Sequence, residues 1–115
     1  MKLLLDTHIW IWHLMGSKDL PKHFREVMAA ESTELWLSPI SVWEAVLLGE
    51  KGRLKLKPNP FAWVRQALLA DQFQQAAITN EIAIISREIS LPHEDPADRI
   101  IAATAVANGF FLATC

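Results

Sequence analysis

A capping residue followed directly by proline occurs three times in this sequence, and this pattern constrains the fold more than any other feature. The three pairs are Ser38-Pro39, Asn59-Pro60 and Asp95-Pro96. In each pair the first side chain can accept a hydrogen bond from a free backbone N–H, and proline is preorganised for the first helical turn. Short apolar runs separate the predicted helices. Strands therefore alternate with helices, which predicts a mostly parallel sheet covered on both faces.

The expected strands and helices can be placed by residue range. The apolar run 2–5 has the form of a buried parallel strand that reaches the sheet edge at Asp6. We expect the other strands at 35–37, 76–78 and 110–114, the last of them buried. We expect a short helix or turn at 9–14, a helix with Pro21 as its first residue, and helices at 39–48, 60–69, 81–89 and 96–108.

Composition indicates one ordinary globular domain that covers residues 1–115. The 115 residues are 51% hydrophobic and 21% charged, which is enough apolar material for an independent core. The only cysteine is Cys115, so no intrachain disulfide can form and the cytoplasm is the expected compartment. No apolar run reaches membrane length, so we expect no membrane association.

The charge distribution leaves nucleic-acid binding open. A net charge of −2 argues weakly against it, because phosphate binding normally depends on an excess of Lys and Arg. Four basic residues nevertheless lie close together in the sequence and could form a local positive patch: Lys51, Arg53, Lys55 and Lys57. Taken in isolation, they are explained slightly better as an ordinary solvated face.

Five tryptophans and no tyrosine are present, and exposed indoles could offer stacking platforms for nucleic-acid bases. Core positions on the expected elements explain three of the five, which are Trp36, Trp43 and Trp63. The positions of Trp10 and Trp12 are left open.

Three acids are expected near the carboxyl edge of the sheet, where functional groups gather in open α/β folds. Asp6 ends the first strand, Glu44 lies in the helix after the second, and Asp98 lies in the first turn of the helix before the last. Clustered carboxylates repel one another unless a cation neutralises them. Magnesium is the simplest candidate, since it prefers oxygen ligands and keeps several waters.

Each acid also has a purely structural explanation. Asp6 could simply cap the helix that follows it. Glu44 could point to solvent, yet its neighbours are apolar and no Lys or Arg lies at helical spacing to pair with it, which favours a role in a site. Asp98 follows Asp95 by three residues, so helix capping explains Asp95 fully and Asp98 in part. No histidine or cysteine spacing matches a zinc site, so His8 and His93 are interpreted as polar residues near the edge.

Four motifs, spread over essentially the whole chain, resemble those of PIN-domain proteins, specifically the VapC-type toxins of type II toxin–antitoxin systems. They are LLDTH at 4–8, SPISVWE at 38–44, GRL at 52–54 and HEDPADRIIAATA at 93–105. The resemblance implies a three-layer α/β/α PIN-like domain and an endoribonuclease that depends on Mg²⁺ or Mn²⁺. The catalytic and metal-binding acids would be Asp6, Glu44 and Asp98, with supporting roles for Thr7, Ser41, Asp95 and Arg99. It also implies RNA as substrate, a small antitoxin that silences the enzyme, and a homodimer.

The sequence departs from the family pattern at its carboxyl end. The pattern usually has a fourth acid directly after the last strand, where this sequence has Ala113-Thr114-Cys115. Two explanations stay open: the C-terminal end is truncated, or the site works with three side-chain acids. In the second case, the α-carboxylate of Cys115 could supply part of the missing negative charge.

Two functions of other classes compete with the nuclease. The first is a non-catalytic PIN-like interaction module, which the missing fourth acid favours. The second is an aspartyl-phosphate phosphatase with Asp6 as nucleophile. That chemistry calls for another aspartate two residues later, and His8 occupies this position.

Overall fold

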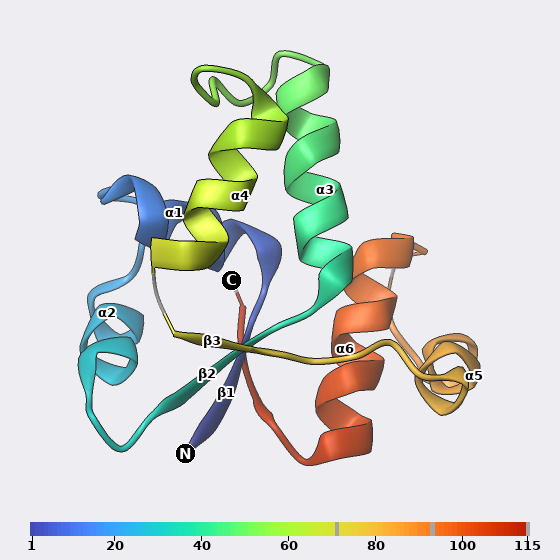
Figure 1. The fold of residues 1–115 in the computed structure, drawn as a ribbon. Helices are drawn as coiled ribbons and strands as arrows, with labels where there is room; N and C mark the ends of the chain where they lie inside the picture. The colour runs from blue at the N-terminus through green and yellow to red at the C-terminus, as the bar shows by residue number, and fades with distance from the viewer. Residues whose placement is uncertain (71, 93, 115) are drawn as a thin grey trace.

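The computed structural model describes residues 1–70, 72–92 and 94–114 and forms four strands and six helices within them (Figure 1). The elements, in chain order, are β1 (Lys2–Leu5), α1 (Thr7–Met15), α2 (Lys22–Ala29), β2 (Glu34–Leu37), α3 (Pro39–Glu50), α4 (Pro60–Ala70), β3 (Phe73–Gln75), α5 (Asn80–Glu88), α6 (Pro96–Asn108) and β4 (Phe111–Ala113). None of the helices in the described residues is long and apolar enough to cross a membrane.

The strands form one sheet in the order β3-β2-β1-β4, and every neighbouring pair in it is parallel. The predicted mostly parallel sheet is therefore confirmed. Parallel pairing brings the carboxyl ends of all these strands to the same edge. Leu5 pairs with Ala113, so Asp6 and Thr114 leave two adjacent strands side by side at that edge.

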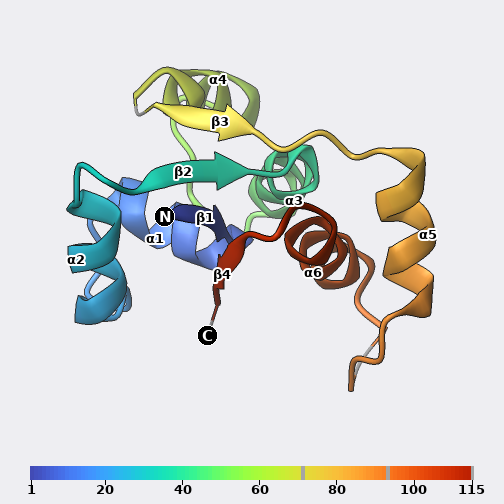
Figure 2. The same ribbon diagram turned by 90° about the horizontal axis from the view of Figure 1, so that it is seen from below.

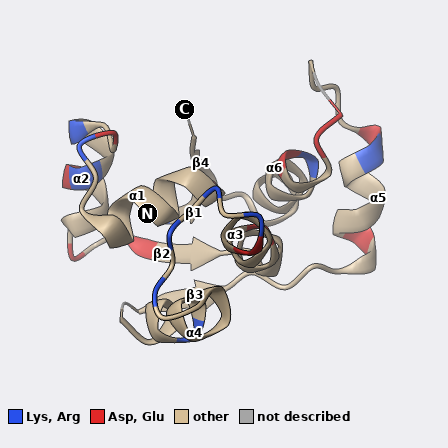
Figure 3. Cartoon of the chain, turned by 90° about the horizontal axis from the view of Figure 1, so that it is seen from above, with Lys and Arg blue, Asp and Glu red and all other residues tan. Residues whose placement is uncertain are grey.

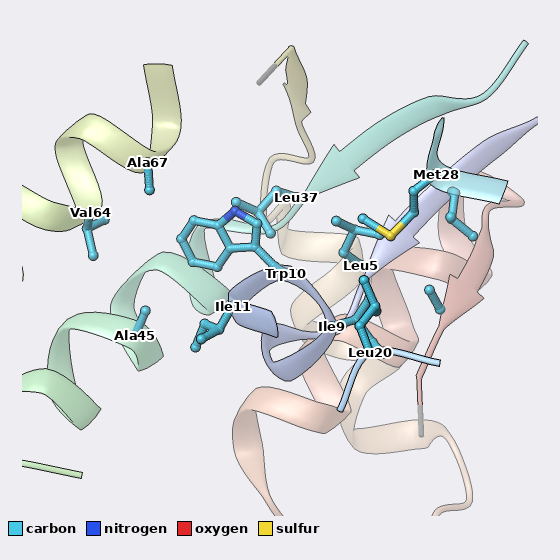
Figure 4. Close-up of a cluster of buried hydrophobic side chains, with 12 residues drawn as sticks. Leu5, Ile9, Trp10, Ile11, Leu20, Met28, Leu37, Ala45, Val64 and Ala67 are labelled. Carbon is cyan, nitrogen blue, oxygen red and sulfur yellow. The ribbon is translucent and has the colours of Figure 1, made fainter. Parts of the chain in front are cut away.

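Helices cover both faces of the sheet, which confirms the predicted three layers. Figure 2 shows the strands between α1 and α2 on one side and α5 and α6 on the other. Alternate residues of β1 divide between the two faces, as strand geometry requires. Leu3 and Leu5 pack into the larger core cluster with Trp10 of α1, whereas Leu4 packs against Ile101 of α6 in a smaller one (Figure 4 shows the larger cluster).

All three predicted helix caps are present, and each one fixes where a helix begins. Ser38 Oγ accepts from the N–H of Ile40, Asn59 Oδ1 from the N–H of Ala62, and Asp95 Oδ1 from the N–H of Asp98. These bonds satisfy backbone donors that a helix leaves without partners in its first turn. Helix α6 ends at Gly109, whose φ of 68° is readily adopted only by glycine.

Several expected elements have other bounds than those observed. The short helix or turn expected at 9–14 is the helix Thr7–Met15, the helix expected at 81–89 is Asn80–Glu88, and the strand expected at 110–114 is Phe111–Ala113. The strand expected at 76–78 is wrong, because β3 runs from Phe73 to Gln75, where its residues pair with β2. Pro21 is the N-cap of α2 and not its first helical residue, and α3 continues two residues beyond the predicted 48. Pairing with β2 sets the position of β3, whereas the other differences are shifts of one or two residues at the ends of elements.

Burial also corrects two predictions. The last strand was expected to be buried and is so only in part, because Phe111 is 66% exposed whereas Ala113 is fully buried. Trp43 was expected in the core but is 59% exposed, whereas Trp10, which was left open, is fully buried at the centre of the larger cluster. Trp36 and Trp63 pack against the core clusters as expected.

Candidate metal centre at the carboxyl edge of the sheet

Two of the three predicted acids face the same pocket, where β1 and β4 end and α6 begins. This pocket has a volume of about 240 Å³ and is lined by Asp6, Leu91, Asp98, Ile101, Ala102, Leu112 and Thr114. Asp6 and Asp98 are separated by most of the chain, and the fold brings them together because β1 lies next to β4 in the sheet. Both residues are half-buried and line the pocket.

Both oxygens of Asp6 already accept hydrogen bonds, and these fix the direction of the carboxylate. Oδ1 accepts from the N–H of Thr7 at 2.8 Å, and Oδ2 accepts from Thr114 Oγ1 at 2.8 Å. The first bond makes Asp6 the N-cap of α1, which confirms the helix-capping role that the sequence suggested for this residue. The second bond ties β1 to the end of β4. Capping and a role in a site are therefore compatible, since each oxygen retains a further lone pair.

Thr7 and Ser41, both predicted as supporting residues, hold two helix starts together. Thr7 Oγ1 donates to Ser41 Oγ at 2.9 Å, and both side chains are completely buried. This bond connects the first residue of α1 to the first turn of α3. Both side chains are shielded from solvent, and the hydrogen bond between them joins α1, which Asp6 caps, to α3, which carries Glu44.

Glu44 lies one turn after Ser41 on α3 and lines a different pocket from Asp6 and Asp98. That pocket also contains Asp95, Lys51 and Arg53. Within the described residues, no three His, Cys, Asp or Glu side chains are grouped closely enough to hold a metal ion. The structure thus brings Asp6 and Asp98 together in one pocket and places Glu44 in another, so the three predicted acids do not form one preformed cluster within the described residues.

The start of α6 is held in place by Asp95 and Arg99. Asp95 caps the helix through the N–H of Asp98. Arg99 is only 5% exposed, and it donates to the carbonyls of Ser86 and Ile89, each at 2.7 Å. Arg99 therefore fastens the end of α5 to the start of α6. These hydrogen bonds hold in place the helix that carries Asp98.

The four basic residues of 51–57 do not form one uniform surface. Figure 3 shows them along the connection between α3 and α4. Lys51 and Arg53 line the pocket that contains Glu44, whereas Lys57 lines another pocket with Leu14 and Trp63. Lys55 is exposed. Only the first two basic residues are therefore next to an acid of the predicted site.

Thr114 is the residue of the site that sequence reasoning missed. The group proposed in its place, the α-carboxylate of Cys115, lies outside the described residues, as does His93. A signal was present in the sequence, because polar residues stand at the carboxyl ends of two predicted apolar strands: Asp6 after 2–5, and Thr114 as the last residue of 110–114. Once those strands are adjacent and parallel, the residues at these ends must meet. His8 is exposed, and its ring is tilted against Trp12 at 5.9 Å.

An open α/β/α sheet with aspartates converging at its carboxyl edge defines a recognisable class of protein. The model of the PIN domain family matches residues 3–115, and the chain belongs to this family. More particularly, it is similar to ribonuclease VapC22 of Mycobacterium tuberculosis. The two are 31% identical over 97% of this chain and 85% of the relative.

Solved structures with the same fold come from toxin–antitoxin complexes. VapBC2 from Rickettsia felis, bound to a DNA fragment from its promoter, matches with a TM-score of 0.70. The match covers 99% of this chain and 87% of that one, at 16% identity, and so shows the fold alone. A toxin–antitoxin complex from Klebsiella pneumoniae matches with a TM-score of 0.65 and 25% identity, over 97% of this chain and 84% of that one.

Proposed function

We propose that this protein is a metal-dependent endoribonuclease that hydrolyses RNA phosphodiester bonds as the toxin of a toxin–antitoxin pair. The observation that carries the proposal is the pairing of Asp6 and Asp98 in one pocket at the carboxyl edge of a PIN-domain sheet. The name of the relative from Mycobacterium tuberculosis, a ribonuclease, supports the choice of reaction.

The residues of the pocket fit a magnesium or manganese ion. Among the described residues that line the pocket, the donors are carboxylate and hydroxyl oxygens, and oxygen donors are the ligands that hard divalent cations prefer. Asp6 and Asp98 would hold the ion, and Glu44, which lines another pocket, would add to the negative charge of the site. When bound, such an ion supplies Lewis-acid activation of a phosphodiester and neutralises the charge that develops on it.

The chain's own residues preorganise this site. The Thr7 N–H and the Thr114 hydroxyl fix both oxygens of Asp6, so little side-chain entropy remains to be lost on binding. Asp98 is in the first turn of α6, where its charge is favoured by the positive end of the helix. The buried Thr7–Ser41 hydrogen bond sets the position of α3, which carries Glu44. Preorganisation of this kind lowers the barrier because the groups need not move during the reaction.

The proposal includes partners. We propose a small antitoxin protein as the inhibitor, supported by the solved toxin–antitoxin complexes that share this fold. A homodimer and a cytoplasmic location, where RNA is available, belong to the same proposal.

A second candidate function has one observation in its favour. Within the described residues no group of three metal-ligating side chains is preformed, as would be expected of a non-catalytic interaction module. The two functions differ in one measurement. A nuclease must gain thermal stability from magnesium or manganese, because an ion that binds only the folded state raises the melting temperature.

The central experiment is a cleavage assay on structured RNAs with magnesium, with manganese and with a chelator. We expect metal-dependent endonucleolytic products from the wild type and none from Asp6→Asn or Asp98→Asn. The matched control is Asp19→Asn, which makes the same change of charge at an exposed loop position. Cleavage at the wild-type rate by both site variants would show that the acids are assigned wrongly.

A further inference from the structure

Trp43 is the largest exposed side chain next to an acid of the proposed site. It precedes Glu44 on α3, and its indole is 59% exposed although every other tryptophan is buried or half-buried. Exposure of an indole forfeits the stabilisation that its burial would contribute to the core. The position of Trp43 therefore needs an explanation other than packing within this chain.

Helix α3 is apolar on two faces, and only one of them packs into the larger core cluster. Val42, Ala45 and Val46 belong to that cluster. The other face carries residues at helical spacing that all line one pocket: Ile40, Trp43, Glu44, Leu47, Leu48 and Lys51. A helix that is apolar all round is normally covered on every side. Ile40 on this face packs against the smaller core cluster, and Leu47 and Leu48 are half-buried, whereas the indole of Trp43 remains available to a ligand.

The pocket beside this face has both an apolar wall and charged groups. Its volume is about 400 Å³, within the range of small-ligand sites, and the start of α6 closes it with Pro96 and Ala97. Lys51 and Arg53 place two cations at the same pocket. An indole face with nearby cations matches the two parts of a nucleotide, since the base stacks and the phosphate pairs with positive charge.

We propose that Trp43 stacks on a base of single-stranded RNA in this pocket, with Lys51 and Arg53 contacting the adjoining phosphates. The inference rests on the proposed ribonuclease function and adds a positioning residue to it. The stacked nucleotide would lie next to Glu44, which lines the same pocket. An apolar protein segment fits this pocket less well, since it would bury Glu44 and Lys51 away from water.

The test measures RNA binding separately from cleavage. Every variant is made in the cleavage-silent Asp98→Asn protein, and the dissociation constant for a short labelled single-stranded RNA is measured by fluorescence anisotropy. Trp43→Leu keeps apolar area without an aromatic face, and Trp43→Phe keeps a smaller aromatic face. Phe61→Leu is the matched control, because Phe61 is an exposed aromatic residue on α4 outside this pocket.

We expect Trp43→Leu to weaken binding roughly tenfold or more, the usual consequence of losing one stacked base. Trp43→Phe should recover most of this loss, and Phe61→Leu should bind like its parent. An RNA with abasic positions throughout should bind equally to the parent and to Trp43→Leu. The proposal is overturned if Trp43→Leu binds unmodified RNA as tightly as its parent.

Two outcomes separate this inference from the proposed function. If wild-type protein does not cleave RNA but Trp43→Leu still weakens RNA binding, the nuclease proposal fails and the stacking site stands. If the wild type cleaves and Trp43→Leu changes only the oligomeric state measured by light scattering, the face is an interface between copies and the stacking site is refuted.

Discussion

Replacing Asp6 by asparagine should remove metal-dependent stabilisation while leaving the metal-free fold nearly unchanged. Asparagine is as good an N-cap as aspartate, and its Oδ1 can still accept from the Thr7 N–H. Its amide can donate to Thr114 Oγ1, which reverses the direction of the second hydrogen bond without breaking it. We therefore expect the metal-free free energy of unfolding to change by less than about 1 kcal/mol.

The metal-bound state should respond much more strongly. At a manganese concentration one hundred times the dissociation constant, a single site adds about 2.7 kcal/mol of stability. In a domain of this size, each kcal/mol moves the melting temperature by about 4 °C, so the wild type should gain about 10 °C. A hundredfold loss of affinity in Asp6→Asn would leave about 0.4 kcal/mol, equivalent to less than about 2 °C.

Differential scanning fluorimetry over a manganese titration measures both quantities, with calorimetry as the check on affinity. Asp19→Asn controls for the change in net charge and should keep the full wild-type shift. If Asp6→Asn keeps the same metal-dependent shift as the wild type, Asp6 is not a ligand. A loss of the shift in Asp19→Asn as well would mean that the ion binds by overall charge and not at the proposed site.

Three further predictions follow from individual contacts. Thr7→Val should lower the free energy of unfolding, measured by urea denaturation, by about 1–3 kcal/mol, because the buried Ser41 hydroxyl loses its donor. A coupling energy near zero in the double-mutant cycle of Thr7→Val with Ser41→Ala would contradict this prediction. Arg99→Lys should lower the free energy of unfolding by about 2–4 kcal/mol, because an ammonium group cannot donate to both the Ser86 and Ile89 carbonyls as the guanidinium does. An unchanged midpoint of urea denaturation would show that these hydrogen bonds do not stabilise the contact between α5 and α6. Joint charge reversal at Lys51 and Arg53 should lower the log–log salt slope of RNA binding by about 0.7 per lost contact and leave metal affinity nearly unchanged. Lys57→Glu, at a different pocket, should leave the slope as it is, and equal effects of the two changes would assign RNA binding to the whole basic loop.

Local signals in the sequence determined most of the elements of this fold. Capping side chains before proline act within one helical turn, so Ser38, Asn59 and Asp95 marked the starts of three helices correctly. The apolar run before Asp6 likewise predicted β1 at its observed bounds. Alternation of such elements was enough to predict a parallel sheet with helices on both faces, because parallel strands need crossover connections.

The tertiary structure alone decided which groups share a pocket and which side chains are exposed. The position of β3 depended on pairing with β2, and the meeting of Asp6 with Thr114 depended on the adjacency of β1 and β4. Helical spacing placed Trp43 in the core, but the core took the opposite face of α3, so the indole is exposed beside Glu44. Strand order and the choice of helix face are set by contacts between distant segments, and a local sequence pattern carries no information about which distant segment it will meet.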